Sequence, residues 1–144
     1  YAGGGEDHEM LRKEVTARGL DGSVLLLGDV LHNKVWELIS SATIVVAPTQ
    51  PTFPEGRCMV AMEALMSGVP VVAPNFGPFP FLIHNNQDGV LYTSGSIDSL
   101  KESIHSILMN PDLYQRLKSG AENRSIELRT PKNTFSEAVQ LSFS

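Results

Sequence analysis

The chain has 144 residues, of which 42% are hydrophobic and 19% are charged, as expected for one soluble globular domain with a core of its own. Its net charge is -5 and its lysines and arginines are scattered, so nothing in the composition supports a nucleic-acid-binding surface. A single cysteine excludes an internal disulfide, and no apolar run reaches the roughly 18 residues that span a bilayer. No secretory signal is visible, so we expect a cytoplasmic location, with peripheral attachment of a longer protein to a membrane left open.

The first forty residues predict the end of a strand, a helix, a buried strand and a second helix. Residues 1–5 are typical of the end of a strand and its turn, so we expect a domain that is incomplete at its N-terminus. The expected elements are a helix over residues 6–18, a buried strand over 23–27 and a helix over 33–41. The loop over residues 28–31 follows the carboxyl end of a strand, where parallel sheets bind ligands. An ordinary connector is the alternative for this loop.

The most informative stretch of the chain begins with an apolar run over residues 43–47 and a loop stiffened by prolines. Residues 56–67 then contain no helix breaker after the first glycine, and a second apolar run covers residues 69–73. This order of strand, loop, helix and strand predicts a right-handed crossover unit of a parallel sheet.

Two glutamates mark the front of the expected helix, Glu55 at its junction with the loop and Glu63 two turns in. A helix N-terminus is electropositive and binds phosphate through its free amides. Carboxylates beside it repel phosphate but suit hydroxyl groups, so the combination describes a nucleotide-sugar pocket. Eight residues of helix span about 12 Å and allow both acids to lie on the same side. From spacing alone, Glu55 as a helix-terminal acid and Glu63 as a solvated surface acid remain open.

The C-terminal half predicts one more strand and further helices. A turn rich in Asn, Asp and Gly covers residues 85–89. The expected elements after it are a strand over residues 90–92, a helix over 97–109 and a helix that begins at Pro111 and ends in the polar stretch 122–129. The regular alternation of strands and helices predicts an α/β fold with a parallel sheet flanked by helices.

The two glutamates are separated by seven residues and are followed by Gly68-Val69-Pro70-Val71-Val72, by Gly77 and by Asp88-Gly89-Val90-Leu91. Together these motifs resemble the C-terminal, donor-binding domain of retaining GT-B glycosyltransferases of the group 1 type, which includes bacterial lipopolysaccharide and capsule sugar transferases. The similarity runs from the glycines at 3–5 to about Phe135, and residues 134–139 resemble the closing helix of the family. It implies that residues 1–144 form the Rossmann-like, C-terminal half of a GT-B fold, with the acceptor domain absent from this chain.

The resemblance also implies a donor site for a nucleotide diphosphate sugar. The residues that match it are Val30, Glu55, Gly56, Arg57, Cys58, Met59, Val60 and Glu63. Glu55 is the acid at the catalytic position and binds hydroxyls of the donor sugar, beside the amides of the three residues that follow it. The next two amides face the diphosphate, Glu63 holds the ribose, and Val30 holds the base through its backbone.

The resemblance further implies retention of configuration at the anomeric carbon, an N-terminal acceptor domain as partner, and no cofactor or metal. The missing Asp-x-Asp pair agrees with metal independence. We therefore expect this segment to bind donor weakly and not to catalyse transfer alone.

One loop departs from the family pattern, because Pro78 stands in place of a second glycine and Phe81 in place of an acid. This departure slightly favours an alternative, a non-catalytic nucleotide-sugar-binding or interaction module of the same fold. A sugar-nucleotide epimerase half of the fold is disfavoured, because that group lacks the glutamate pair. The four histidines and Cys58 show no metal-ligand spacing, and neither a nucleophile elbow nor a P-loop is present.

Overall fold

The structure is a computed structural model that describes residues 1–52, 56 and 58–130. The chain divides into two compact units, Tyr1–Leu38 and Ile39–Ser144, and helix α2 (His32–Ser41) runs across the division. The expected helix over residues 134–139 lies outside the described residues.

The first unit contains α1 (His8–Ala17) and two extended segments. The amino group of Tyr1 donates a hydrogen bond of 2.7 Å to the Leu25 carbonyl, and the Leu27 amide donates one of 2.9 Å to the Tyr1 carbonyl. These bonds follow the pattern of parallel strands, in agreement with the strand end expected at the first residues. The prediction of a strand over residues 23–27 is wrong, however. The pairing with the first residues is too short to form a regular ladder, so this segment is extended without being a strand.

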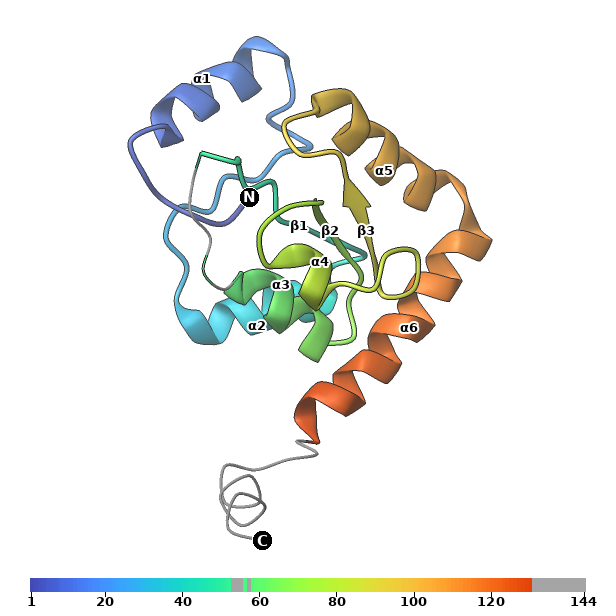
Figure 1. The fold of residues 1–144 in the computed structure, drawn as a ribbon. Helices are drawn as coiled ribbons and strands as arrows, with labels where there is room; N and C mark the ends of the chain where they lie inside the picture. The colour runs from blue at the N-terminus through green and yellow to red at the C-terminus, as the bar shows by residue number, and fades with distance from the viewer. Residues whose placement is uncertain (53–55, 57, 131–144) are drawn as a thin grey trace, which may run out of the picture. The chain divides into compact units, whose positions relative to one another are not determined.

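The second unit is built on a parallel sheet of three strands in the order β1-β2-β3, shown in Figure 1. The strands are β1 (Val45–Val46), β2 (Val71–Pro74) and β3 (Gly89–Tyr92). Val46 pairs with Val72, and Val72 pairs with Val90. The strands therefore lie within or directly beside the three apolar runs that the sequence predicts.

In the described part of this unit, four helices follow β1, and they flank the sheet. They are α3 (Met59–Met66), α4 (Phe79–Leu82), α5 (Ile97–Met109) and α6 (Pro111–Arg129). The bounds of α5 confirm the sequence prediction, whereas α4 was not expected. Its single turn begins after Pro78 and contains Pro80 in its first turn, a position that the fixed φ angle of proline favours.

The prediction that the central helix opens at Gly56 is wrong, because α3 begins at Met59 and Cys58 is its N-cap residue. Glycine and cysteine are weaker helix formers than the Met, Ala and Leu residues that make up most of α3. The estimate of about 12 Å between Glu55 and Glu63 assumed one continuous helix, so it does not apply.

One hydrophobic cluster joins the sheet to α5 and α6. Val72, Tyr92, Ile107 and Leu117 are buried at its centre, and Leu100, Ile104, Leu113 and Tyr114 are among the side chains that pack around them. Successive strand residues point to opposite faces, so Val72 and Tyr92 define the face that these two helices cover. The helical spacing of apolar residues in α5 also predicts that Leu108 faces inward, and this prediction is wrong, because Leu108 is 57% exposed.

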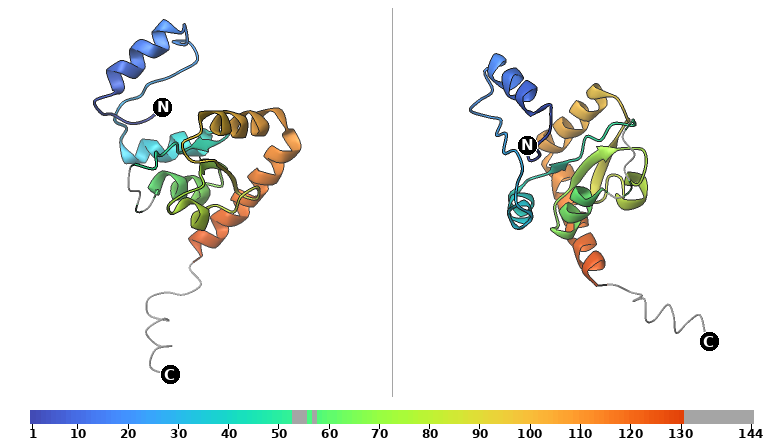
Figure 2. Two further views of the ribbon diagram at one scale, coloured as in Figure 1. Left: turned by 45° about the horizontal axis from the view of Figure 1, so that its top comes forward. Right: turned by 90° about the vertical axis from the view of Figure 1, so that its left-hand side faces the viewer.

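The parallel strands give the sheet a carboxyl edge, where β1, β2 and β3 end, and an amino edge, where they begin. Helix α3 connects the carboxyl end of β1 to the amino end of β2. Its first turn therefore lies at the carboxyl edge and its last turn at the amino edge. The second half of α6 packs against α3, as Figures 1 and 2 show. Within the described ranges, none of the helices combines the length and the hydrophobicity of a membrane span.

Candidate functional site

The first turn of α3 presents backbone amides at the carboxyl edge of the sheet. Helix geometry leaves these amides without intrahelical partners. Cys58, the N-cap residue, is buried, whereas Met59 and Val60 are 54% and 38% exposed. Two residues of the first turn are therefore partly exposed, and the dipole of the helix favours an anionic group at this end.

Glu63 lies on the second turn of α3 and is only 8% exposed. This burial contradicts the alternative that Glu63 is a solvated surface acid. Glu63 follows Met59 by four residues, so both lie on the same face of the helix. The structure thus brings a buried carboxylate and the exposed first turn together on one short element.

The other expected site residues are placed as follows. Gly56 is exposed and lies in a bend before α3, and Glu55 and Arg57 lie outside the described residues. Val30 is half-buried in the first unit, shortly before α2, whereas Gly56 and α3 belong to the second unit.

Two loops at the carboxyl edge are joined through Asn75. Its amide donates a hydrogen bond of 2.9 Å to the Tyr92 carbonyl, and its side-chain oxygen accepts one of 2.9 Å from the Ser94 amide. The residues after β2 and β3 are therefore held together. Phe81 follows on α4 and is 87% exposed, so this position offers an apolar ring and no charge.

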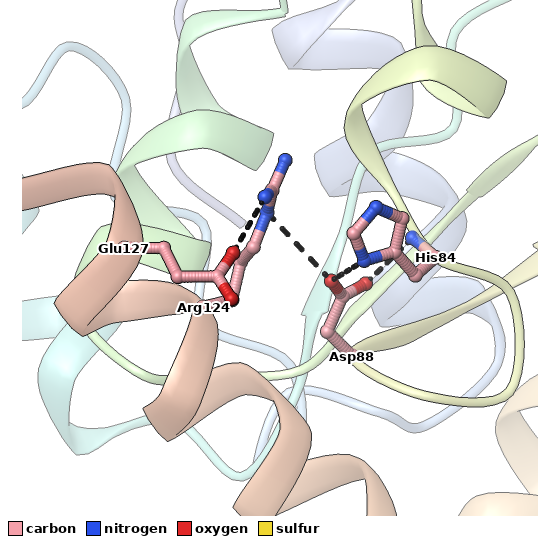
Figure 3. Close-up of polar contacts among 4 residues, drawn as sticks. All are labelled: His84, Asp88, Arg124 and Glu127. Carbon is pink, nitrogen blue, oxygen red and sulfur yellow. Dashed lines mark hydrogen bonds and ion pairs between the residues drawn. The ribbon is translucent and has the colours of Figure 1, made fainter. Parts of the chain in front are cut away.

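A polar cluster at the amino edge was not anticipated by the sequence analysis, and Figure 3 shows its four residues. The Asp88 side chain is 2% exposed, and its Oδ1 atom accepts a hydrogen bond of 2.8 Å from the His84 amide. His84 Nδ1 lies 3.3 Å and Arg124 Nε 3.9 Å from Asp88 Oδ2. Arg124 Nη1 also donates a bond of 2.9 Å to Glu127. The contact between Asp88 and Arg124 therefore brings a charged pair from the turn before β3 and from α6 together.

Burial raises the pKa of Asp88 above its ordinary value of 3.8. The hydrogen bond from the His84 amide and the charges of His84 and Arg124 oppose this shift without cancelling it. An open pocket of about 240 Å³ adjoins the cluster and is lined by residues that include Gln87 and Asn123. The cluster precedes β3, so it lies at the opposite edge of the sheet from the first turn of α3.

Among the residues that the structure describes, no three His, Cys, Asp or Glu side chains converge in a way that could hold a metal ion.

Comparison with known sequences points to one family, because the family model described as Glycosyl transferases group 1 matches residues 1–124. The lipopolysaccharide core biosynthesis mannosyltransferase LpcC of Rhizobium leguminosarum bv. viciae is 30% identical over 105 residues, which cover 73% of this chain and 28% of that protein. An uncharacterized glycosyltransferase of Haemophilus influenzae is 28% identical over 116 residues, which cover 80% of this chain and 31% of that protein. The chain thus spans between 25% and 31% of the length of the first curated relatives that it matches.

Solved structures show the same arrangement of elements. A mutant of S. aureus TarM in complex with Fondaparinux, alpha-GlcNAc-glycerol and UDP has a TM-score of 0.77 and 25% identity, covering 99% of this chain and 28% of that one. Anabaena HepE in complex with UDP and glucose has a TM-score of 0.72 and 25% identity, covering 86% and 34%. The C-terminal domain of a group 1 glycosyl transferase (LpcC) from Francisella tularensis has a TM-score of 0.73 and covers 86% and 63%. Its 20% identity shows likeness of fold alone.

Proposed function

Because the chain belongs to the glycosyl transferases group 1 family, we propose that it is the donor-binding domain of a retaining glycosyltransferase and binds a nucleotide diphosphate sugar. Its parallel sheet flanked by helices is the Rossmann-like, C-terminal half of a GT-B fold. The observation that carries the proposal is the geometry of α3, which places an open first turn at the carboxyl edge and buries Glu63 one turn later.

The residues of α3 suit the two halves of the donor. The amides of Met59 and Val60 bind the diphosphate, because a helix N-terminus supplies N–H donors and positive potential. The carboxylate of Glu63 accepts hydrogen bonds from the ribose hydroxyls. When the bond to the sugar breaks, negative charge grows on the departing diphosphate, and the amides stabilise it electrostatically.

The remaining roles follow from the motif around Glu55. We propose that Glu55 binds the hydroxyls of the transferred sugar. The backbone amides of Gly56, Arg57 and Cys58 lie beside Glu55 and contact the same part of the donor. Val30 contacts the base through its backbone. Retention at the anomeric carbon and independence from metal belong to the same proposal.

Two classes of nucleotide are supported by the relatives. TarM and HepE were solved with UDP, and a relative from Mycobacterium tuberculosis, 28% identical over 114 residues, is described as a GDP-mannose-dependent mannosyltransferase. The relatives are also several times longer than this chain. The acceptor is therefore expected to bind an N-terminal domain of a longer protein, and the present chain is expected to bind donor weakly without transferring sugar.

Isothermal titration of the 144-residue chain with UDP-glucose, GDP-mannose and ADP-glucose tests the proposal. One nucleotide class should bind, and Glu63→Ala should weaken its binding by about 2 kcal/mol, or about thirtyfold, because a charged hydrogen-bond acceptor is lost. Glu102→Ala removes an exposed acid from α5 and is the matched control. Unchanged affinity in Glu63→Ala, or no binding of any of the three donors, would contradict the proposal.

The non-catalytic binding module remains the second candidate, since Phe81, which departs from the acid of the resembled family pattern, is exposed. The two candidates differ in the longer protein. An enzyme releases free nucleotide diphosphate and forms a product whose anomeric configuration, read by NMR, matches that of the donor. A binding module holds the donor and leaves it intact.

A further inference from the structure

The C-terminal end of α3 is held by side chains from a distant part of the sequence. Ser125 Oγ donates a hydrogen bond of 2.6 Å to the Met66 carbonyl, and Arg129 Nε donates one of 3.0 Å to the same oxygen. Lys118 Nζ donates a bond of 2.7 Å to the Gly68 carbonyl. All three donors belong to α6 and lie 50 to 63 residues from their acceptors in the sequence.

The three donors form a stripe on α6, because intervals of seven and four residues return to the same face of a helix. Glu122 lies on this stripe and fills the space against Gly68, where a Cβ atom would lie 3.2 Å from Glu122 Cγ and 3.4 Å from Glu122 Cα. We call Lys118, Ser125 and Arg129 the carbonyl clamp. The position of α6 against the end of α3 is therefore fixed in two ways, by the packing of Glu122 on Gly68 and by the hydrogen bonds of the clamp to the Met66 and Gly68 carbonyls.

The chemistry of the clamp matches the end of the helix that it contacts. The last carbonyls of a helix have no intrahelical donors, and they form the negative end of its dipole. Lys118 and Arg129 supply positive charge there as well as N–H donors. Helix α3 has eight residues, and a helix this short is not stable alone and depends on tertiary contacts.

A short helix transmits a displacement from one end to the other. Eight residues rise about 12 Å, so the clamped carbonyls lie two turns from the amides of Met59 and Val60. Movement of α3 along its axis would move these amides and the Glu63 carboxylate by the same amount. Helices within a packed core move as rigid elements, because interiors contain few voids.

We propose that Lys118, Ser125 and Arg129 are positioning residues, which set the place of α3 along its axis and thereby the geometry of the donor site. The inference rests on the proposed function for its ligand and on the observed hydrogen bonds for its mechanism. Loss of the clamp should weaken donor binding in protein that remains folded. A role in stability alone would instead leave the affinity of the folded protein unchanged.

Backbone NMR spectra of the 144-residue chain test the clamp without ligand. The double variant Ser125→Ala/Arg129→Gln should shift the amide resonances of Met59 and Val60, two turns away from the substitutions. Arg116→Gln changes an exposed residue of the same helix and should leave these resonances in place. Unmoved Met59 and Val60 resonances in the double variant would overturn the proposal.

Affinity provides the second measurement, with UDP and GDP as the probes. The double variant should bind the preferred nucleotide about five- to tenfold more weakly, since two hydrogen bonds that place α3 are lost. Ser125→Thr keeps the hydroxyl group, so this variant should bind the nucleotide with nearly the affinity of the wild type. Leu113→Ala weakens the packing of α6 on the hydrophobic cluster around Val72 and Leu117. It therefore serves as a control that lowers stability and leaves the carbonyl clamp intact.

Equal losses of affinity in Leu113→Ala and the double variant would show that stability alone is measured, and would overturn the proposal. If the double variant does not fold, Ser125→Ala alone removes one donor and supports the same comparison with Ser125→Thr. If the wild-type chain binds neither nucleotide, the proposed function fails, while the ligand-free spectra still decide whether the clamp sets the position of α3.

Discussion

The two ends of α3 differ in how their backbone groups are satisfied. At the amino edge, Ser125 and Arg129 donate hydrogen bonds to the Met66 carbonyl, and Lys118 donates to the carbonyl of Gly68. At the carboxyl edge, the first turn is partly exposed and its N-cap residue, Cys58, makes no capping hydrogen bond with its side chain. The two ends of α3 therefore differ, because side chains of α6 donate hydrogen bonds at the C-terminal end, whereas residues of the first turn are partly exposed.

The same contrast holds for the sheet as a whole. The amino edge is covered by α6, which contacts both α3 and the turn that contains Asp88. The carboxyl edge is formed by loops, of which two are joined by Asn75. Ligands of open α/β sheets usually bind at the carboxyl edge, on loops that the rest of the sheet supports.

The largest effect is expected at Gly120, where α6 meets the turn before β3. A Cβ atom at this position would lie 1.9 Å from the Gln87 carbonyl oxygen and 2.7 Å from its carbon. Alanine is the better helix former, yet Gly120→Ala should lower the unfolding free energy by about 3 kcal/mol, because backbone cannot yield as a side chain does. Urea denaturation measures the change. A Cβ atom at Gly22 would meet no atom within 4 Å, so Gly22→Ala should leave the unfolding free energy nearly unchanged. An unchanged unfolding free energy in Gly120→Ala would contradict the close packing of α6 on the turn before β3.

A smaller effect is expected at Ser96, the N-cap residue of α5, whose side chain accepts a hydrogen bond of 3.1 Å from the Ser99 amide. Ser96→Ala should cost about 1 kcal/mol, the usual value for loss of an N-cap. Ser96→Asp keeps an acceptor and should retain most of the stability. This pair sharpens the comparison with α3, because it measures what a side-chain cap contributes to a neighbouring helix in the same unit.

Asn75 tests the carboxyl edge, and its effect should be smaller again because the hydrogen bond to the Ser94 amide is exposed. Asn75→Ala should cost about 0.5–1 kcal/mol, whereas Asn75→Asp preserves the acceptor oxygen and should cost less. Urea denaturation of both variants provides the measurement. A loss as large as that of Gly120→Ala would show that contacts at the two edges contribute equally to stability and would remove the distinction between them.

The smallest expected change is a pH dependence at the amino edge. Burial raises the pKa of Asp88 above 3.8, so the folded state holds the proton more tightly than the unfolded state. Protonation of Asp88 therefore stabilises the folded state at a pH below the pKa of Asp88 in the unfolded chain. This stabilisation is lost as the pH rises through the pKa of Asp88 in the folded state. The unfolding free energy of the wild type relative to Asp88→Asn should therefore fall with rising pH across this window.

Two further observations check the Asp88 prediction. The charge of Arg124 opposes the upward shift, so Arg124→Gln should move the Asp88 titration to higher pH when it is followed by carboxyl NMR. Glu127 pairs with Arg124, and Glu127→Gln should produce a smaller change, since it leaves the guanidinium charge in place. A difference between wild type and Asp88→Asn that stays constant with pH would show that Asp88 titrates alike in both states.

The order of most elements could be predicted, because each of these elements carries its own local signal. Helix α5 begins and ends where the sequence predicts it, since Ser96 caps its start, its apolar residues recur at helical spacing and Pro111 begins the next helix. Apolar runs located β1, β2 and β3 for the same reason, whereas the apolar run over residues 23–27 forms no regular strand. The family was also accessible from sequence, because the glutamate spacing and the motifs after it lie close together along the chain.

Local signals failed where the outcome depends on several neighbours. The start of α3 was placed three residues too early, because the absence of a breaker after Gly56 does not show that a helix has formed. Helix α4 was missed, since a proline-rich single turn has no periodicity to detect. Leu108 has the pattern of a buried residue and is exposed, because only the path of the neighbouring elements decides which side of a helix is covered.

The sequence by itself determined the fold class, the parallel strands, most of the helices and the family, because hydrophobic period, caps and motif spacing act over a few residues. Only the tertiary structure decided that Glu63 is buried, that Asp88 meets Arg124 and that Ser125 and Arg129 hold the end of α3. These contacts join residues 36 to 63 positions apart or depend on packing around them. A spacing rule along one element cannot reach that far, because the relative placement of two elements is set by the whole core between them.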